Sequence, residues 1–322
     1  MVPEEMIPFL NVLLFPGLLF LFSLAFFGEW MDRKVVAKLQ NRVGPLYTGP
    51  WGTLQPLADF IKLLSKEDIT PSAVDRLLFS LTPILILSFS LTPLFLIPMS
   101  DRSALVWFEG DLIFIMFVTT LIALIMFLGA WSSTNRFSTL GGVRVALQML
   151  SYEIPLTIAM ICPAISAKSL SVSRIVQSQA VGPWYLLTQP IGFAIVIVCF
   201  LAELHMVPFD VPKAETEIVA GWLVEFSGKK LALLRLAKDF ELVLAASLMA
   251  SLYLGGPLGP WQLHPTMYFL AKFIVCILIL SNLRALFARF RIDQVLLGAW
   301  KYLTPLAFIQ VVLVELVPVV IP

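Results

Sequence analysis

The chain has 322 residues, of which 59% are hydrophobic and only 13% are charged. Soluble domains carry about 25% charged residues, so this composition is that of an integral membrane protein. The net charge of +1 excludes the basic footprint that nucleic-acid binding requires. Three cysteines stand singly in apolar runs and the two histidines are far apart in the sequence, so we expect no metal or iron–sulfur cluster on this chain.

Hydropathy predicts eight membrane spans, each with about 20 mainly apolar residues. They lie roughly at residues 8–28, 77–98, 111–131, 141–165, 186–207, 239–255, 267–287 and 302–321. The N-terminal stretch MVPEEMIPFL has two acids and no Lys or Arg, the wrong charge for a signal peptide, so we expect the first span to remain in the protein. Without a recognisable internal repeat, the chain is expected to form a single membrane domain over residues 1–322.

Between the first two spans, residues 51–66 (WGTLQPLADFIKLLSK) place apolar side chains at helical spacing with charged side chains between them. This pattern predicts an amphipathic helix that lies at the membrane interface, because it is too polar to cross. The expected fold is therefore an all-α polytopic membrane protein with about eight transmembrane helices plus an amphipathic interfacial helix.

The positive-inside rule predicts the orientation. The odd-numbered loops and their edges hold seventeen Lys and Arg residues, and the even-numbered loops hold three. The cytoplasmic loops are therefore expected at about residues 29–76, 132–140, 208–238 and 288–301, with both termini outside a plasma membrane.

Several ionisable residues lie within the predicted spans, where each costs roughly 2.5–3.5 kcal/mol. Glu153 and Arg144 share one span but are about half a helical turn out of phase, so each needs a partner on another element. We interpret Glu153 and Glu203 as proton-exchanging carboxylates, with a neutralised structural role as the alternative. Asp239 and Glu241 are explained equally well by their position at the start of a helix.

The segment after the fifth span, AELHMVPFDVPKAETEIVAGWLVEFSG, interleaves acids with large apolar side chains. A solvated loop would be uniformly polar, so we expect this one to be partly buried. Its acids Asp210, Glu215, Glu217 and Glu225 are close in sequence, and carboxylates that are close together in a low dielectric share protons. The pattern predicts a proton-loading or electrostatic coupling site.

Five segments in this order make the chain resemble the H subunit of respiratory complex I, which is the first subunit of the mitochondrial NADH dehydrogenase, and its relatives in membrane-bound nickel–iron hydrogenases. The segments are MDRKVVAKLQNRVGP, LQPLADFIKLLSKED, GAWSSTNRFSTLGGVRVALQMLSYEIPL, PFDVPKAETEIVAGWLVEFSGKKLAL and RIDQVLLGAWKYLTP. The resemblance covers nearly the whole chain. It implies a non-catalytic membrane subunit of a respiratory-chain oxidoreductase complex that starts a chain of buried charges leading into antiporter-like subunits.

The resemblance also implies roles for particular residues. Proton or charge coupling would fall to Glu153, Arg144, Glu203, Asp210, Glu215, Glu217, Glu225 and Asp239. Docking of the peripheral redox arm would involve Asp32, Arg33, Arg42, Lys229, Arg291 and Asp293. No cofactor would be bound by this chain, since iron–sulfur clusters, and in the hydrogenase branch a nickel–iron centre, belong to partner subunits.

Departures from the quinone-reducing pattern separate the branches of this family. Quinone-reducing members typically have Glu-Thr-Asn-Arg before Pro-Phe-Asp, whereas this chain has Glu203-Leu-His-Met-Val, and Lys213 replaces a family Glu. We therefore expect a ferredoxin-linked pump whose electrons end on protons or a sulfur compound. The alternative is a quinone-site subunit of a NADH or coenzyme F420 dehydrogenase, and a stand-alone ion carrier is the third hypothesis.

Overall fold

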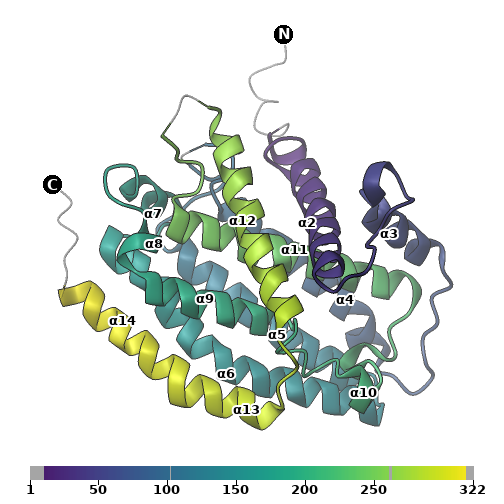
Figure 1. Cartoon of the computed structure of the whole chain (residues 1–322). Helices are drawn as coiled ribbons and strands as arrows, with labels where there is room; N and C mark the ends of the chain where they lie inside the picture. Colours follow the sequence, from purple (N-terminus) through teal and green to yellow (C-terminus); the bar gives the residue numbers. More distant parts are fainter. Residues whose placement is uncertain (1–10, 102, 261–262, 317–322) are drawn as a thin grey trace.

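The computed structural model describes residues 11–101, 103–260 and 263–316, and all regular elements in these ranges are helices (Figure 1). The predicted all-α polytopic fold is confirmed. Six described helices are long and apolar enough to cross a membrane. They comprise Asn11–Leu39, which contains α2 (Leu18–Leu39); Arg76–Leu96, made of α4 (Arg76–Leu91) and the 3-10 helix η2 (Thr92–Leu96); α5 (Asp111–Ser132); α6 (Arg136–Ala167); α12 (Pro265–Leu286); and Ile292–Leu316, in which the π-helix η4 (Ala299–Leu303) joins α13 (Ile292–Gly298) to α14 (Thr304–Leu316).

The other two predicted spans differ in length from the expectation. The fifth is the short apolar helix α9 (Pro190–Glu203), preceded by α7 (Val172–Ser178) and α8 (Tyr185–Thr188). The sixth is part of α11 (Gly228–Leu254), whose polar first half precedes the apolar segment predicted at 239–255. Charged residues in the first half of α11 lower its mean hydropathy without ending the helix.

Two predicted cytoplasmic loops are partly helical. α2 continues to Leu39, past the predicted end at residue 28, so Asp32 and Arg33 lie on a helix. Residues expected in the 288–301 loop form α13 and the start of η4. Hydropathy marks the edge of the hydrocarbon region, whereas a helix ends only where its backbone hydrogen bonds end. The first three residues of the first predicted span and residues 317–321 of the last lie outside the described ranges.

α11 forms the centre of the described structure. Every residue from Phe240 to Leu254 is buried, and the helix packs against α2, α4 and α12. A helix that is buried on all sides needs neighbours around its whole circumference. The acids at the start of this apolar segment are therefore placed inside the protein.

The amphipathic helix is confirmed as α3 (Gln55–Ser65), which starts after the short 3-10 helix η1 (Pro50–Gly52). It packs on α2 and α11 (Figure 1). The acidic segment between α9 and α11 contains only one turn of helix, α10 (Glu215–Ile218), and the 3-10 helix η3 (Gly221–Leu223). This irregular segment covers the end of α6.

Candidate functional site: a polar cavity joined to buried carboxylates

A polar cavity of about 380 Å³ lies where α2, α11 and α12 meet the acidic segment. Ionisable side chains dominate its lining: Glu29, Asp32 and Arg33 from α2, Lys213 and Glu215 from the acidic segment, Arg235, Lys238 and Asp239 from α11, and Arg284 from α12. Asp32 and Arg33 lie three and four residues after Glu29, so the continuation of α2 places both beside Glu29, on neighbouring sides of the helix. The cavity brings Asp239 and Glu215, but not the other predicted coupling residues, into one lining.

Asp32 joins α2 to α12. Its side chain accepts a hydrogen bond from the Ser281 hydroxyl at 2.8 Å and forms an ion pair with Arg284. Only 4% of Asp32 is exposed. A carboxylate that is buried and paired within the chain holds helices together, and a role of Asp32 in docking a peripheral arm stays a prediction.

Arg33 joins α2 to the amphipathic helix. Its guanidinium donates to Asp59 at 2.7 Å and pairs with Glu29 one turn earlier. Burial acts to raise the pKa of Asp59, but the hydrogen bonds from Arg33 and Gln55 outweigh it and hold that pKa below its usual value. Arg33 therefore fixes α3 against the cavity wall, and its expected docking role would require this pair to open.

Lys213 projects from the acidic segment toward the cationic side of the cavity. Burial, together with the neighbouring ammonium of Lys238, lowers the pKa of Lys213 well below its usual value, against the opposing attraction of Asp210 and Glu241. Asp210 has a buried carboxylate oxygen that no described residue contacts by a hydrogen bond. The lowered pKa makes Lys213 easier to deprotonate than a lysine in water.

Electrostatic neighbours connect the cavity to the membrane helices. The carboxyl groups of Asp239 and Glu29 are in hydrogen-bonding contact, and Asp239 also lies beside Lys238. Lys238 is in contact with Lys213, and both cations act on Glu241. The series therefore runs from α2 through the acidic segment to α11.

Glu203 continues this series into the helix bundle. It lies within electrostatic range of Glu241 on one side and Glu153 on the other. Glu203, Glu241 and His205 line a small cavity of about 10 Å³ beside α5, on the order of the space for one water. One oxygen of each acid and Nε2 of His205 are buried without a hydrogen-bond partner among the described residues. Buried polar atoms of this kind are where internal water or a shared proton is found.

Glu153 accepts a hydrogen bond from the Thr120 hydroxyl of α5. Arg144, on the same helix, forms an ion pair with Glu217 at 2.6 Å. The prediction that Glu153 and Arg144 find partners on different elements is thus confirmed.

Glu217 is held between two arginines. Arg144 of α6 and Arg289 from the segment before α13 each contact one of its carboxylate oxygens at 2.6 Å. The hydrogen bond from Arg144 is the main cause of a lowered pKa at Glu217, and Arg289 adds to it. Glu217 therefore stays ionised and clamps the acidic segment to two other parts of the fold.

Gly141 lets the acidic segment approach α6, and Gly221 lets the segment fold back on itself at Pro212. A Cβ atom at Gly141 would lie 2.4 Å from the backbone nitrogen of Trp222, and one at Gly221 would lie 1.8 Å from the carbonyl oxygen of Pro212. Gly221 also has a φ of +58°. Only glycine satisfies both the close contact and that backbone conformation.

The remaining predicted site residues lie apart from the cavity lining. Glu225 accepts a hydrogen bond from the Asn135 side chain, which also caps α6. Lys229, Arg291 and Asp293 are exposed, and their role in docking a partner stays a prediction. Arg42 is exposed at the end of α2, near Arg33 and Arg284.

Several residues of the site were not among the predicted ones. Glu29 follows the predicted end of the first span, and hydropathy alone does not mark it as a site residue. Arg235 and Lys238 enter the sequence prediction only as cations of a cytoplasmic loop. Because α11 starts at Gly228, Arg235 and Lys238 lie three residues apart on this helix and share nearly the same face. Arg289 could not have been found locally, since it is 72 residues from its partner Glu217.

Comparison with known proteins identifies the family of the chain. Residues 12–315 match the NADH dehydrogenase family. The chain is 37% identical over 284 residues to the NADH-quinone oxidoreductase H subunit of Dehalococcoides mccartyi strain CBDB1, covering 88% of this chain and 80% of the relative. It is 38% identical over 321 residues to the corresponding protein of Thermomicrobium roseum, covering 92% of each chain. The chain therefore belongs to the NADH dehydrogenase family that includes the H subunit of NADH-quinone oxidoreductase.

Proposed function

We propose that this chain is the membrane-anchor and coupling subunit of a complex I-like, redox-driven ion pump. The observation that carries the proposal is the pair of cavities: the polar cavity gathers Asp239, Lys238 and Lys213, and the small cavity is lined by Glu203 and Glu241, with Glu153 within electrostatic range of Glu203. A charge or proton that arrives at the cavity changes the free energy of protonation of the nearest ionisable group. The changed charge of that group then alters the protonation of the next group in the series. The chain itself transfers no electrons in this mechanism.

The magnitude of this effect is sufficient for coupling. Two unit charges about 4 Å apart interact by about 4 kcal/mol at an effective dielectric constant of 20. Every tenfold change in occupancy requires about 1.4 kcal/mol. One redox-linked charge at the cavity would therefore redistribute protons along the series, which is the bias that a pump needs.

We propose a quinone as the electron acceptor. The relatives are named NADH-quinone oxidoreductases, and they favour the quinone branch over the hydrogenase branch. The cavity suits a quinone headgroup because Lys213, Arg235 and Lys238 offer hydrogen-bond donors while Leu231 and Leu242 offer apolar contact. The ferredoxin-linked hydrogenase branch is the second candidate, favoured by Glu203-Leu-His-Met-Val and by Lys213 in place of a family Glu.

The assembly that this function requires is also a proposal. Peripheral redox-arm subunits carrying iron–sulfur clusters, and in the hydrogenase branch a nickel–iron centre, would meet the cytoplasmic face. Antiporter-like subunits would continue the charge series within the membrane. The distribution of Lys and Arg supports both termini outside and the acidic segment in the cytoplasm.

The test replaces Glu203 with Gln in the intact complex within inverted membrane vesicles. Electron transfer and ion uptake are measured together, with Glu109→Gln as the matched control because Glu109 is 75% exposed and pairs only with Arg174 among the described residues. Glu203→Gln should abolish ion uptake or stop turnover, and the control should retain both. Normal uptake in Glu203→Gln would refute the charge series.

The electron acceptor is tested separately with an azido-quinone in the purified complex. Photolabelling of peptides that contain Lys213 or Lys238, prevented by excess unlabelled quinone, would support the quinone branch. Turnover with ferredoxin and protons without labelling of this cavity would select the hydrogenase branch instead.

A further inference from the structure

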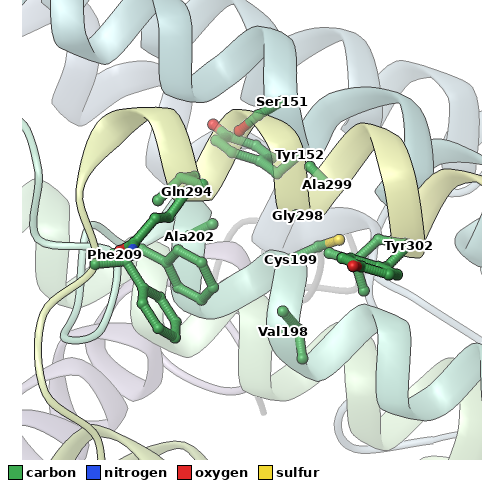
Figure 2. Close-up of a pocket in the computed structure, with 13 residues that line it drawn as sticks. Ser151, Tyr152, Val198, Cys199, Ala202, Phe209, Gln294, Gly298, Ala299 and Tyr302 are labelled. Carbon is green, nitrogen blue, oxygen red and sulfur yellow. The ribbon is translucent and has the colours of Figure 1, made fainter.

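A second, apolar pocket of about 420 Å³ is separate from the polar cavity, and Tyr152 lies between it and the small cavity of Glu203 and Glu241 (Figure 2). α13 and η4 form one wall, α6 and α9 form the opposite wall, and Phe209 and Phe290 close one end. Their rings are 5.8 Å apart and tilted by 56°. Figure 2 shows Phe209 and Tyr302 at opposite sides of this space, with Cys199 between them.

Small residues at the π-helix create the space. Gly298 and Ala299 face α6 and α9 where larger side chains would fill the gap. A Cβ atom built at Gly298 meets no atom within 4 Å. Gly298 has helical backbone angles, φ −62° and ψ −45°, so its backbone does not require glycine. The absent side chain therefore leaves room that packing within the chain does not use.

Two polar groups of the lining are engaged inside the protein, and the phenol groups of Tyr152 and Tyr302 also line the pocket. The Ser151 hydroxyl donates to the carbonyl of Gln148 at 2.6 Å, and the side-chain oxygen of Gln294 accepts from the backbone N–H of Arg291 at 3.1 Å. The rest of the lining is mainly hydrocarbon and aromatic. The pocket therefore suits a hydrocarbon chain, whereas the polar cavity offers the cationic donors Lys213, Arg235 and Lys238 that suit a quinone headgroup.

The surroundings of the pocket are those of a lipid contact. On α13, η4 and α14, large apolar and aromatic side chains point outward, including Leu297, Trp300, Tyr302, Phe308 and Val312. Trp and Tyr are typical of the membrane–water interface. The Nζ atom of Lys301 is 5.5 Å from the ring centroid of Tyr302, and Arg291 is exposed at the start of α13. Cations at this position favour an anionic headgroup.

We propose that this pocket binds one acyl chain of an anionic phospholipid, with its phosphate near Lys301 or Arg291. The acyl chain fills the space beside Gly298 and Cys199, and the headgroup remains at the interface beside one of the two cations. The lipid packs between the π-helix η4, which joins α13 to α14, and α6. This site is separate from the polar cavity, so it does not depend on the proposed electron acceptor.

The experiment uses the purified complex in vesicles that contain phosphatidylglycerol with a diazirine in one acyl chain. After irradiation, labelled positions are mapped by mass spectrometry. We expect label on residues 198–202, since Cys199 is fully buried and an acyl chain reaches it only through the pocket. Absence of label there in the unaltered protein would overturn the proposal.

Two matched variants separate the pocket from general lipid contact. Gly298→Phe fills the pocket, and a loss of room for about two methylenes should reduce labelling of residues 198–202 by about tenfold. Leu297→Phe adds a ring at the neighbouring position, which is 66% exposed, and should leave that labelling unchanged. Equal labelling in both variants would contradict the assignment.

Two further comparisons identify the occupant. The same diazirine chain on phosphatidylcholine should label residues 198–202 several-fold less, and equal labelling would refute the preference for an anionic headgroup. Loss of label on adding excess quinone would assign the pocket to quinone. Labelling only after the chain is separated from its partners would assign it to a partner helix, and either result would overturn the lipid site.

Discussion

Replacing Glu217 with Gln tests whether the two-arginine clamp holds the acidic segment in place. Arg144 and Arg289 are each 25% exposed and Glu217 is 47% exposed at the side chain, so both ion pairs are partly screened by water. Pairs of this kind contribute about 0.2–1 kcal/mol each. Losing both should cost about 0.5–2 kcal/mol and make the segment open about 2- to 30-fold more often.

Hydrogen exchange measures this opening directly. Amides of residues 208–227 in the intact complex should exchange faster in Glu217→Gln, while the buried part of α11 should be unchanged. Glu109→Gln removes a similar ion pair elsewhere and should not affect residues 208–227. Unchanged exchange of the acidic segment in Glu217→Gln would show that the arginines do not hold it.

The pH dependence of the clamp follows from the same contacts. The pKa of Glu217 in the folded protein lies below its ordinary value of 4.5, chiefly because of the hydrogen bond from Arg144. Its contribution is therefore fully present above pH 4.5 and is lost as the pH falls through the lowered pKa. Exchange of residues 208–227 should accelerate, relative to Glu217→Gln, only in that acidic range.

Two further predictions concern the polar cavity. Asp32→Ala should lower the free energy of unfolding by about 1.5–3 kcal/mol, which is the range for a lost hydrogen bond to a charged group. SDS titration of the chain in mixed micelles measures this change. A change as small as that of the exposed Lys62→Ala would contradict the buried pairing of Asp32. Burial and Lys238 lower the pKa of Lys213, so acetic anhydride at pH 7–8 should modify Lys213 faster than the exposed Lys229. Peptide mass spectrometry measures both rates. The variant Lys238→Gln should slow the reaction of Lys213. An acetylation rate of Lys213 that is the same in Lys238→Gln would contradict the electrostatic effect of Lys238 on Lys213.

The predicted fold agreed with the structure where the bilayer constrains composition. Long apolar runs were recognised because a spanning helix must satisfy its own backbone and expose hydrocarbon. The ends of α2 and α11 were not recognised, since charged residues at the interface continue a helix without changing its hydrogen bonds. The cavity is lined by those unrecognised turns, so hydropathy missed part of the site.

The helical period predicted more of the site than hydropathy did. It required different partners for Arg144 and Glu153, and the structure supplies Glu217 to the first and Thr120 to the second. The period could not name those partners, because they are 73 and 33 residues away and depend on how the elements pack.

Asp32 shows why a charged residue beside a cation-rich stretch is not necessarily on the surface. In sequence it belongs to Asp-Arg-Lys, which reads as the start of a cytoplasmic loop. On α2, however, successive residues turn by 100°, so Asp32 faces α12 while Arg33 faces α3. One points into the protein and is satisfied by Ser281 and Arg284, and the other reaches Asp59 at the cavity edge. Charges in adjacent positions at a membrane interface must therefore be assigned by helical face before they are assigned to a partner protein.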